Sequence, residues 1–103
     1  MKYSEAMLKG FEMAGFRKAR HTRQADNGSV CALGAAALAL KGSAHAMPNE
    51  EDRARIAFLD AYGTEIAFAS NGDDHDPHAR TADNGRPGLP VDVIAGMLKA
   101  IGH

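Results

Sequence analysis

The most informative segment of the chain reads Ser29-Val30-Cys31-Ala32-Leu33-Gly34-Ala35-Ala36-Ala37-Leu38-Ala39-Leu40-Lys41-Gly42. From Val30 to Leu40 it holds no charged side chain, and its commonest residue is alanine, the best helix former. Ser29 offers an oxygen that can cap the helix start, and Gly42 offers a left-handed stop. A helix that is apolar on every face belongs inside a fold. Since a bilayer span takes about 20 apolar residues, the segment predicts a buried helix around which others pack.

The N-terminal segment predicts a helix that begins at a Ser4 cap and ends at Gly15. Glycine inside a helix costs about 1 kcal/mol relative to alanine, so Gly10 is expected to permit a close contact with another element. The apolar residues of this helix fall at helical spacing and form one stripe: Met7, Leu8, Phe11 and Ala14.

A third helix is expected to begin at Pro48-Asn49-Glu50-Glu51-Asp52, with Asn49 as its cap and acidic residues in its first turn. It runs to Gly63 along a stripe made by Arg55, Ile56, Leu59 and Tyr62, and Phe58 lies to the side of that stripe. Thr64 can then cap a short helix over 65–70, although Ile66 and Phe68 alternate with alanine as in a strand.

The last helix is expected from Pro90 to Ile101, with Gly102 as its stop. Four of its side chains have the spacing of a core-facing stripe: Ile94, Met97, Leu98 and Ile101. Before the Ala-rich segment, residues 25–28 (Ala-Asp-Asn-Gly) predict a turn within a loop or a short irregular hairpin.

These elements predict an all-α fold, a compact bundle of four to five short helices around the central Ala-rich helix. The 103 residues are enough for one domain with one core, so residues 1–103 are expected to form a single helical domain. A long polar loop over 71–90 interrupts it, and loops of this length are often functional or disordered.

Charge is unevenly distributed although the net charge is only −1. Residues 1–24 carry six basic and two acidic side chains, whereas residues 49–92 carry ten acidic side chains and four arginines. Such a chain can self-associate head to tail or offer two oppositely charged faces. One cysteine excludes an internal disulfide framework and suits a reducing cytoplasm, and no signal peptide or membrane-spanning run is present. We therefore expect a cytoplasmic protein with no membrane partner.

Two polar segments are candidate binding sites. The first is basic and contains Arg17, Lys18, Arg20 and Arg23, which can pair with the acidic residues of a partner protein. These side chains could also contact phosphates of a nucleic acid. No interleaved aromatic residues or recognisable motif supports that alternative, and the acidic second half opposes it. A solvated loop is the third interpretation.

The second segment contains Asp73, Asp74, His75, Asp76 and His78. Imidazole and carboxylate groups suit zinc or manganese, so this loop could hold a divalent metal in a structural or hydrolytic site. It matches no established ligand spacing, however, and lacks the glycine and final glutamate of a calcium loop. A solvated acidic loop is therefore the simpler interpretation. No cofactor other than such a metal is expected.

Cys31 could be a nucleophile, because a helix N-terminus favours the thiolate form. His21 and His45 would be its candidate bases, but nothing in the sequence brings either one near it. A cysteine in an Ala/Leu run is more typical of a small core residue. No catalytic residue is predicted, and the sequence favours a protein that is not an enzyme.

The chain resembles a group of small uncharacterised proteins of bacteriophages, prophages and actinobacteria. The resemblance rests on Tyr3-Ser4-Glu5-Ala6, Lys9-Gly10, Cys31-Ala32-Leu33-Gly34-Ala35-Ala36, Ile66 with Asn71-Gly72-Asp73-Asp74-His75, and Val93-Ile94 with Leu98. The resemblance carries no known activity over to this chain. It implies a small intracellular accessory protein, encoded by a phage, that contacts a host or phage protein. Self-association is a secondary expectation.

Overall fold

The computed structural model describes residues 1–17, 24–63 and 91–103. Four α-helices lie in these residues: α1 (Tyr3–Met13), α2 (Ala32–Lys41), α3 (Asn49–Tyr62) and α5 (Val91–Ala100). No strand occurs there, and the only bridge of the β type joins Gln24 to Val30. The structure is thus mostly helical, as expected. The predicted helix over 65–70 and the loop over 71–90 fall outside the described residues.

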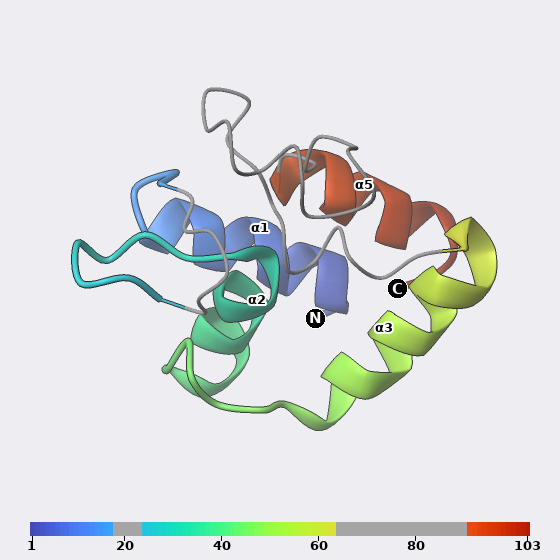
Figure 1. Cartoon of the computed structure of the whole chain (residues 1–103), viewed down its shortest axis with the longest axis horizontal. Helices are drawn as coiled ribbons and strands as arrows, with labels where there is room; N and C mark the ends of the chain where they lie inside the picture. Colours follow the sequence, from blue (N-terminus) through green and yellow to red (C-terminus); the bar gives the residue numbers. More distant parts are fainter. Residues whose placement is uncertain (18–23, 64–90) are drawn as a thin grey trace.

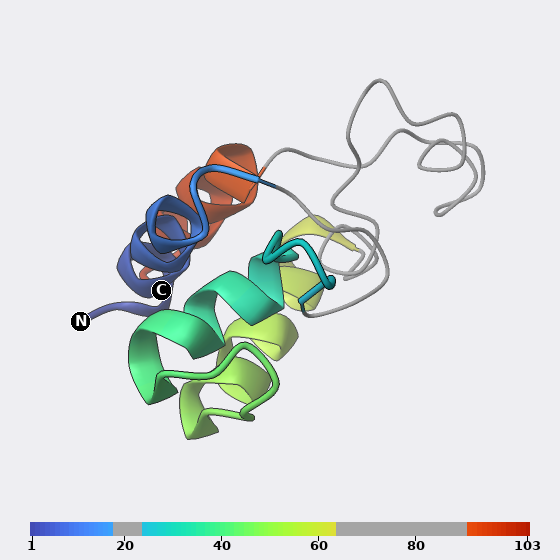
Figure 2. The same cartoon turned by 90° about the vertical axis from the view of Figure 1, so that its left-hand side faces the viewer.

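Helix α1 packs against α2 on one side and α5 on another, and it also touches α3. Figure 2 shows α1 and α5 side by side, with α2 and α3 beyond them. Of the described helices, α1 therefore has extensive contacts with α2 and α5 and a small contact with α3. These contacts do not confirm the central place predicted for the Ala-rich helix.

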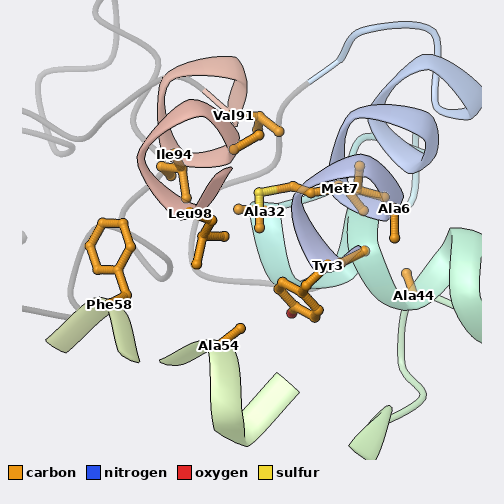
Figure 3. Packing of buried hydrophobic residues seen from close by; sticks show 14 of the residues in the cluster. Tyr3, Ala6, Met7, Ala32, Ala44, Ala54, Phe58, Val91, Ile94 and Leu98 are labelled. Atoms are coloured by element: carbon orange, nitrogen blue, oxygen red, sulfur yellow. The ribbon is translucent and has the colours of Figure 1, made fainter. Parts of the chain in front are cut away.

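The hydrophobic core lies where α1, α2 and α5 meet and is extended by one face of α3 (Figure 3). Its largest fully buried apolar side chains are Phe58, Met7, Ile94, Leu98, Val30 and Val91. Much of the rest is alanine, so the backbones rather than bulky side chains fill the contact between α1 and α2. Core packing of this kind depends on close approach of the helices.

The closest approach joins Gly10 of α1 to Ala35 of α2. A Cβ atom added at Gly10 would overlap the carbonyl group of Ala35 and lie 2.9 Å from its Cα. The predicted close contact at Gly10 is thus confirmed. The buried face of α1 contains Tyr3, Ser4, Ala6, Met7, Gly10 and, just past the helix, Ala14. The predicted stripe is therefore wrong for Leu8, which is 45% exposed, because the face that meets α2 follows the glycine and alanines.

Helix α3 turns a different face to the core than its large aliphatic residues suggest. Phe58 is fully buried together with Ala54 and Glu51, whereas Ile56 is 59% and Leu59 42% exposed. Two residues of the expected stripe, Ile56 and Leu59, thus lie on the outer face, and Phe58 is the core residue. The ring of Tyr62, at the end of this helix, packs against that of Phe58 at a tilt of 54°, with ring centroids 4.8 Å apart. Its hydroxyl donates a hydrogen bond of 2.8 Å to the carbonyl of Met97 and so ties α3 to α5.

The predicted helix stops are confirmed, but the predicted caps are not. Gly15, Gly42, Gly63 and Gly102 have positive φ beyond the helix ends, as expected. The N-caps are Lys2, Cys31 and Pro48 instead of Ser4, Ser29 and Asn49. Ser29 lies two residues before the observed N-cap, Cys31. Its hydroxyl and its N–H both donate to the side-chain oxygen of Asn27, so Ser29 belongs to the preceding turn. That local turn keeps the chain extended until Cys31.

Helix α5 follows its prediction closely. Ile94 and Leu98 are fully buried, and Met97 and Ile101 pack partly buried against the same cluster. Pro90, the expected first residue, lies outside the described residues. The helix ends in a Schellman arrangement, in which the N–H of Gly102 donates to Lys99 and that of His103 to Leu98. The His103 carbonyl then accepts from the N–H of Ser4 at 2.9 Å, which brings the ends of α5 and α1 together (Figure 1).

Candidate functional site

The candidate site is built on the C-terminal end of α1. Here the N–H of Gly15 donates to Glu12 and that of Phe16 donates to Phe11, both at 2.9 Å. This pair of bonds is a Schellman motif, and it normally needs one left-handed residue. In this chain two consecutive residues are left-handed, Gly15 with φ 72° and Phe16 with φ 59°.

Phe16 is held away from the core by this backbone conformation. Its side chain is 66% exposed, and its ring meets the ring of Phe11 edge to face with centroids 5.7 Å apart. A left-handed conformation costs a residue with a Cβ roughly 1–2 kcal/mol. Phe16 is the only non-glycine residue with positive φ in the described parts of the chain. Strain of this kind at an exposed aromatic residue is a feature of binding sites.

Phe16 forms one wall of a groove of about 670 Å³ between α1 and the start of α5. Figure 2 shows these two helices next to each other. The apolar lining comes from Leu8, Phe11, Phe16 and Val91, and the charged lining residues are Lys9, Glu12 and Asp92. A lining that combines apolar side chains with a few charged groups is the usual composition of a binding groove.

Arg17 follows directly and is anchored on two sides. Its Nε donates a 3.0 Å hydrogen bond to the carbonyl of Ala14, at the negative end of the α1 dipole. Its own carbonyl accepts from the N–H of Val30 at 3.0 Å. The guanidinium lies over Gly28, where an added Cβ would be 3.1 Å from Nη2. Arg17 therefore joins the end of α1 to the segment that leads into α2.

That segment is a short irregular hairpin, as expected. Gln24 and Val30 form the antiparallel bridge, and the N–H of Ala25 donates to the carbonyl of Ser29 at 2.9 Å. The Asn27 side-chain oxygen accepts from the N–H of Ser29 at 3.0 Å and from its hydroxyl at 2.6 Å. The turn is thus closed by its own side chains, which gives the Arg17 guanidinium a defined surface to lie on.

Of the predicted partner-binding residues, the structure describes Arg17 alone. Arg17 is exposed and directly follows the groove residue Phe16 in the chain, but it does not line the groove. Lys18, Arg20 and Arg23 lie outside the described residues. So do all the predicted metal ligands: Asp73, Asp74, His75, Asp76 and His78. Within residues 1–17, 24–63 and 91–103, no three His, Cys, Asp or Glu side chains lie close enough to hold a metal ion.

Cys31 caps helix α2, since its sulfur accepts the N–H of Gly34 at 3.3 Å. The residue is only 4% exposed. A buried cysteine that packs in a core and serves as a helix cap has a structural role, and a reagent or substrate has little access to it. His45 is exposed in the connector before α3, and His21 lies outside the described residues.

The groove is the part of this site that was not predicted from sequence. The helical spacing predicts Leu8 in the buried stripe of its helix, and Phe16 belongs to none of the predicted helices. A signal for Phe16 does exist: in a Schellman motif the second residue past the helix often packs on an apolar residue one turn back. Gly15 followed by Phe16, with Phe11 five residues before it, fits that pattern. The contribution of Val91 depends on how α5 docks, which no local signal contains.

No helix in the described part of the chain combines the length and the apolar character needed to span a membrane. Comparison with models of known protein families, with curated proteins and with solved structures finds no match to this chain.

Proposed function

We propose that the protein is a non-enzymatic binding protein that acts by contact with another protein through the groove between α1 and α5. The observation that supports this most is Phe16, a strained aromatic residue exposed at the wall of an apolar groove. Aromatic anchors are enriched among the residues that dominate binding energy at protein interfaces. The groove suits an apolar side of a helix or an extended segment of the partner.

Arg17 extends this proposed interface beyond the apolar groove. Its side chain is positioned by the bond to Ala14, and the residue follows Phe16 in the chain. An acidic residue of a partner that covers both Phe16 and Arg17 would therefore meet a positioned guanidinium. The proposal includes Lys18, Arg20 and Arg23 as further contacts. The resemblance to phage and prophage proteins makes a host protein in the cytoplasm the expected partner.

The test separates binding from folding at Phe16. Replacement of Phe16 by glycine removes the exposed ring and relieves the left-handed strain, so stability should stay equal or rise by about 1 kcal/mol. Binding should fall at the same time. A photo-crosslinking amino acid at position 16, in cells that make the protein, should capture one protein partner. The same group at position 96, which has open space around it on α5, serves as the matched control.

Two further variants complete the test. Leu8→Ser and Phe16→Gly should each reduce binding of the captured partner at least tenfold, in line with loss of an anchor residue at an interface. Met13→Ser removes an apolar side chain that is 56% exposed and does not line the groove, so binding should be unchanged. If crosslinking at positions 16 and 96 gives the same products, or if Phe16→Gly binds as well as the native chain, the groove is not the binding site.

A further inference from the structure

The outer face of α3 carries an apolar ridge that the core does not use. Ile56 is 59% and Leu59 is 42% exposed, on the side opposite the buried Ala54 and Phe58. Helix α3 lies at one edge of the described part of the molecule (Figure 1). These two aliphatic side chains, three residues apart on an outer helix face, form a small apolar patch.

The charged residues beside this ridge form a pattern that is complementary to a second copy of the same helix. Arg53, Ile56 and Asp60 follow one another at intervals of three and four residues, so they lie along one flank of the helix. Both charged side chains are exposed, as is Asp52, which lies in line with Ile56 and Leu59 at the start of the ridge. The basic residue thus stands one turn before Ile56, and the acidic residue one turn after it, on the same flank.

A second copy of α3 fits this pattern when it runs antiparallel. A twofold axis perpendicular to the helices brings the same flank of both copies together and sets the first half of one helix against the second half of the other. When Ile56 packs on Leu59 of the second copy, Arg53 lies two residues, or about 3 Å along the axis, from the level of Asp60 of that copy. An arginine side chain spans such an offset easily.

This arrangement forms the opposite-charge pair twice, once on each side of the axis. A parallel arrangement of the two helices would place the paired residues on opposite flanks and so separate Arg53 from Asp60. We therefore propose that the protein forms an antiparallel homodimer through Ile56 and Leu59 of α3, with Arg53 of each copy paired to Asp60 of the other. This surface is separate from the groove between α1 and α5, so the dimer and the proposed partner can be bound together.

Sedimentation equilibrium of the full chain over a range of concentrations tests the dimer. Because the interface is small, we expect a dissociation constant on the order of 100 µM. Ile56→Ser should shift the protein to monomer, while Met13→Ser, an equally exposed apolar residue on α1, should leave the association unchanged. Circular dichroism melts confirm that both variants fold, which is expected because neither side chain is in the core.

Charge reversal gives a sharper test of the antiparallel geometry. Arg53→Asp and Asp60→Arg should each weaken the dimer on the order of tenfold, because each creates two like-charge pairs. An equimolar mixture of these two variants should recover association, since both pairs in the heterodimer are then of opposite charge. The native chain remaining a monomer, or the mixture failing to recover, would overturn the proposal. So would a dimer that is lost with Leu8→Ser but kept with Ile56→Ser, which would place the interface at the groove.

Discussion

Replacement of Gly10 by alanine would probe the contact on which the packing of α1 against α2 depends. The added Cβ would overlap the carbonyl carbon and oxygen of Ala35 and stand 2.9 Å from its Cα. These are main-chain atoms inside a helix, so they cannot rotate away as a flexible side chain would. The two helices would have to separate by roughly 1–2 Å before carbon and oxygen atoms reach ordinary contact distances.

The expected cost follows from this separation. Overpacking in a core typically costs about 1–3 kcal/mol when side chains can adjust. A rigid main-chain obstacle places Gly10→Ala above that range, at about 4 kcal/mol. Alanine returns about 1 kcal/mol through its better helix propensity. The net loss of unfolding free energy is therefore about 3 kcal/mol, a large part of the total for a domain of this size, and the melting temperature should fall by about 15 °C.

Urea unfolding followed by far-UV circular dichroism measures this loss, with an unchanged slope showing that the transition remains two-state. The matched control is Gly96→Ala on α5, where an added Cβ meets nothing within 4 Å. That variant should gain about 0.5–1 kcal/mol. Ala35→Gly added to Gly10→Ala should not restore stability, because the obstacle includes the carbonyl group. A midpoint for Gly10→Ala at or above that of the native chain would refute the close approach of α1 and α2.

Four other substitutions test the packing and the links between helices. Phe58→Ala should lower the unfolding free energy, measured by urea unfolding, by about 3–5 kcal/mol, whereas Ile56→Ala should change it by less than about 0.5 kcal/mol. A larger loss for Ile56→Ala than for Phe58→Ala would show that the face predicted from sequence is the buried one. Arg17→Ala should cost about 1 kcal/mol through its lost hydrogen bond and helix-end charge, so a thermal melt equal to that of the native chain would contradict its anchoring role. Tyr62→Phe removes the bond to Met97 and should cost about 1 kcal/mol, with faster hydrogen exchange in α5; unchanged exchange would show that this bond does not hold α3 to α5.

Helix ends were the part of the fold that local rules predicted best. Gly42 and Gly63 stop their helices with φ of 76° at the expected positions, because a left-handed residue is a local requirement that glycine meets. Helix starts were predicted less well. Ser29 is a good capping residue by type, but Asn27 forms a closer local turn with it, and a choice between two local hydrogen bonds depends on geometry that composition does not contain.

The orientation of α3 shows why the site could be predicted only in part. Both faces of this helix carry large apolar residues, Phe58 on one and Ile56 with Leu59 on the other. A count of apolar spacings favours the face with more of them. The structure buries the other face, on which Phe58 lies with the small Ala54 and with Glu51. The same limit applies to the groove, which needs residues from α1 and α5 that are more than 70 positions apart.

The bond from Arg17 to Ala14 has a consequence for the rate and strength of any encounter at this surface. A free arginine loses much of its rotational freedom when it docks, at a cost of about 0.5–1.5 kcal/mol. In this protein the Nε hydrogen bond restricts that freedom before a partner arrives. The terminal nitrogens remain available as a fork for a carboxylate. Arg17 is thus a preorganised contact, so a partner that binds this surface should not have to fix the conformation of the Arg17 side chain.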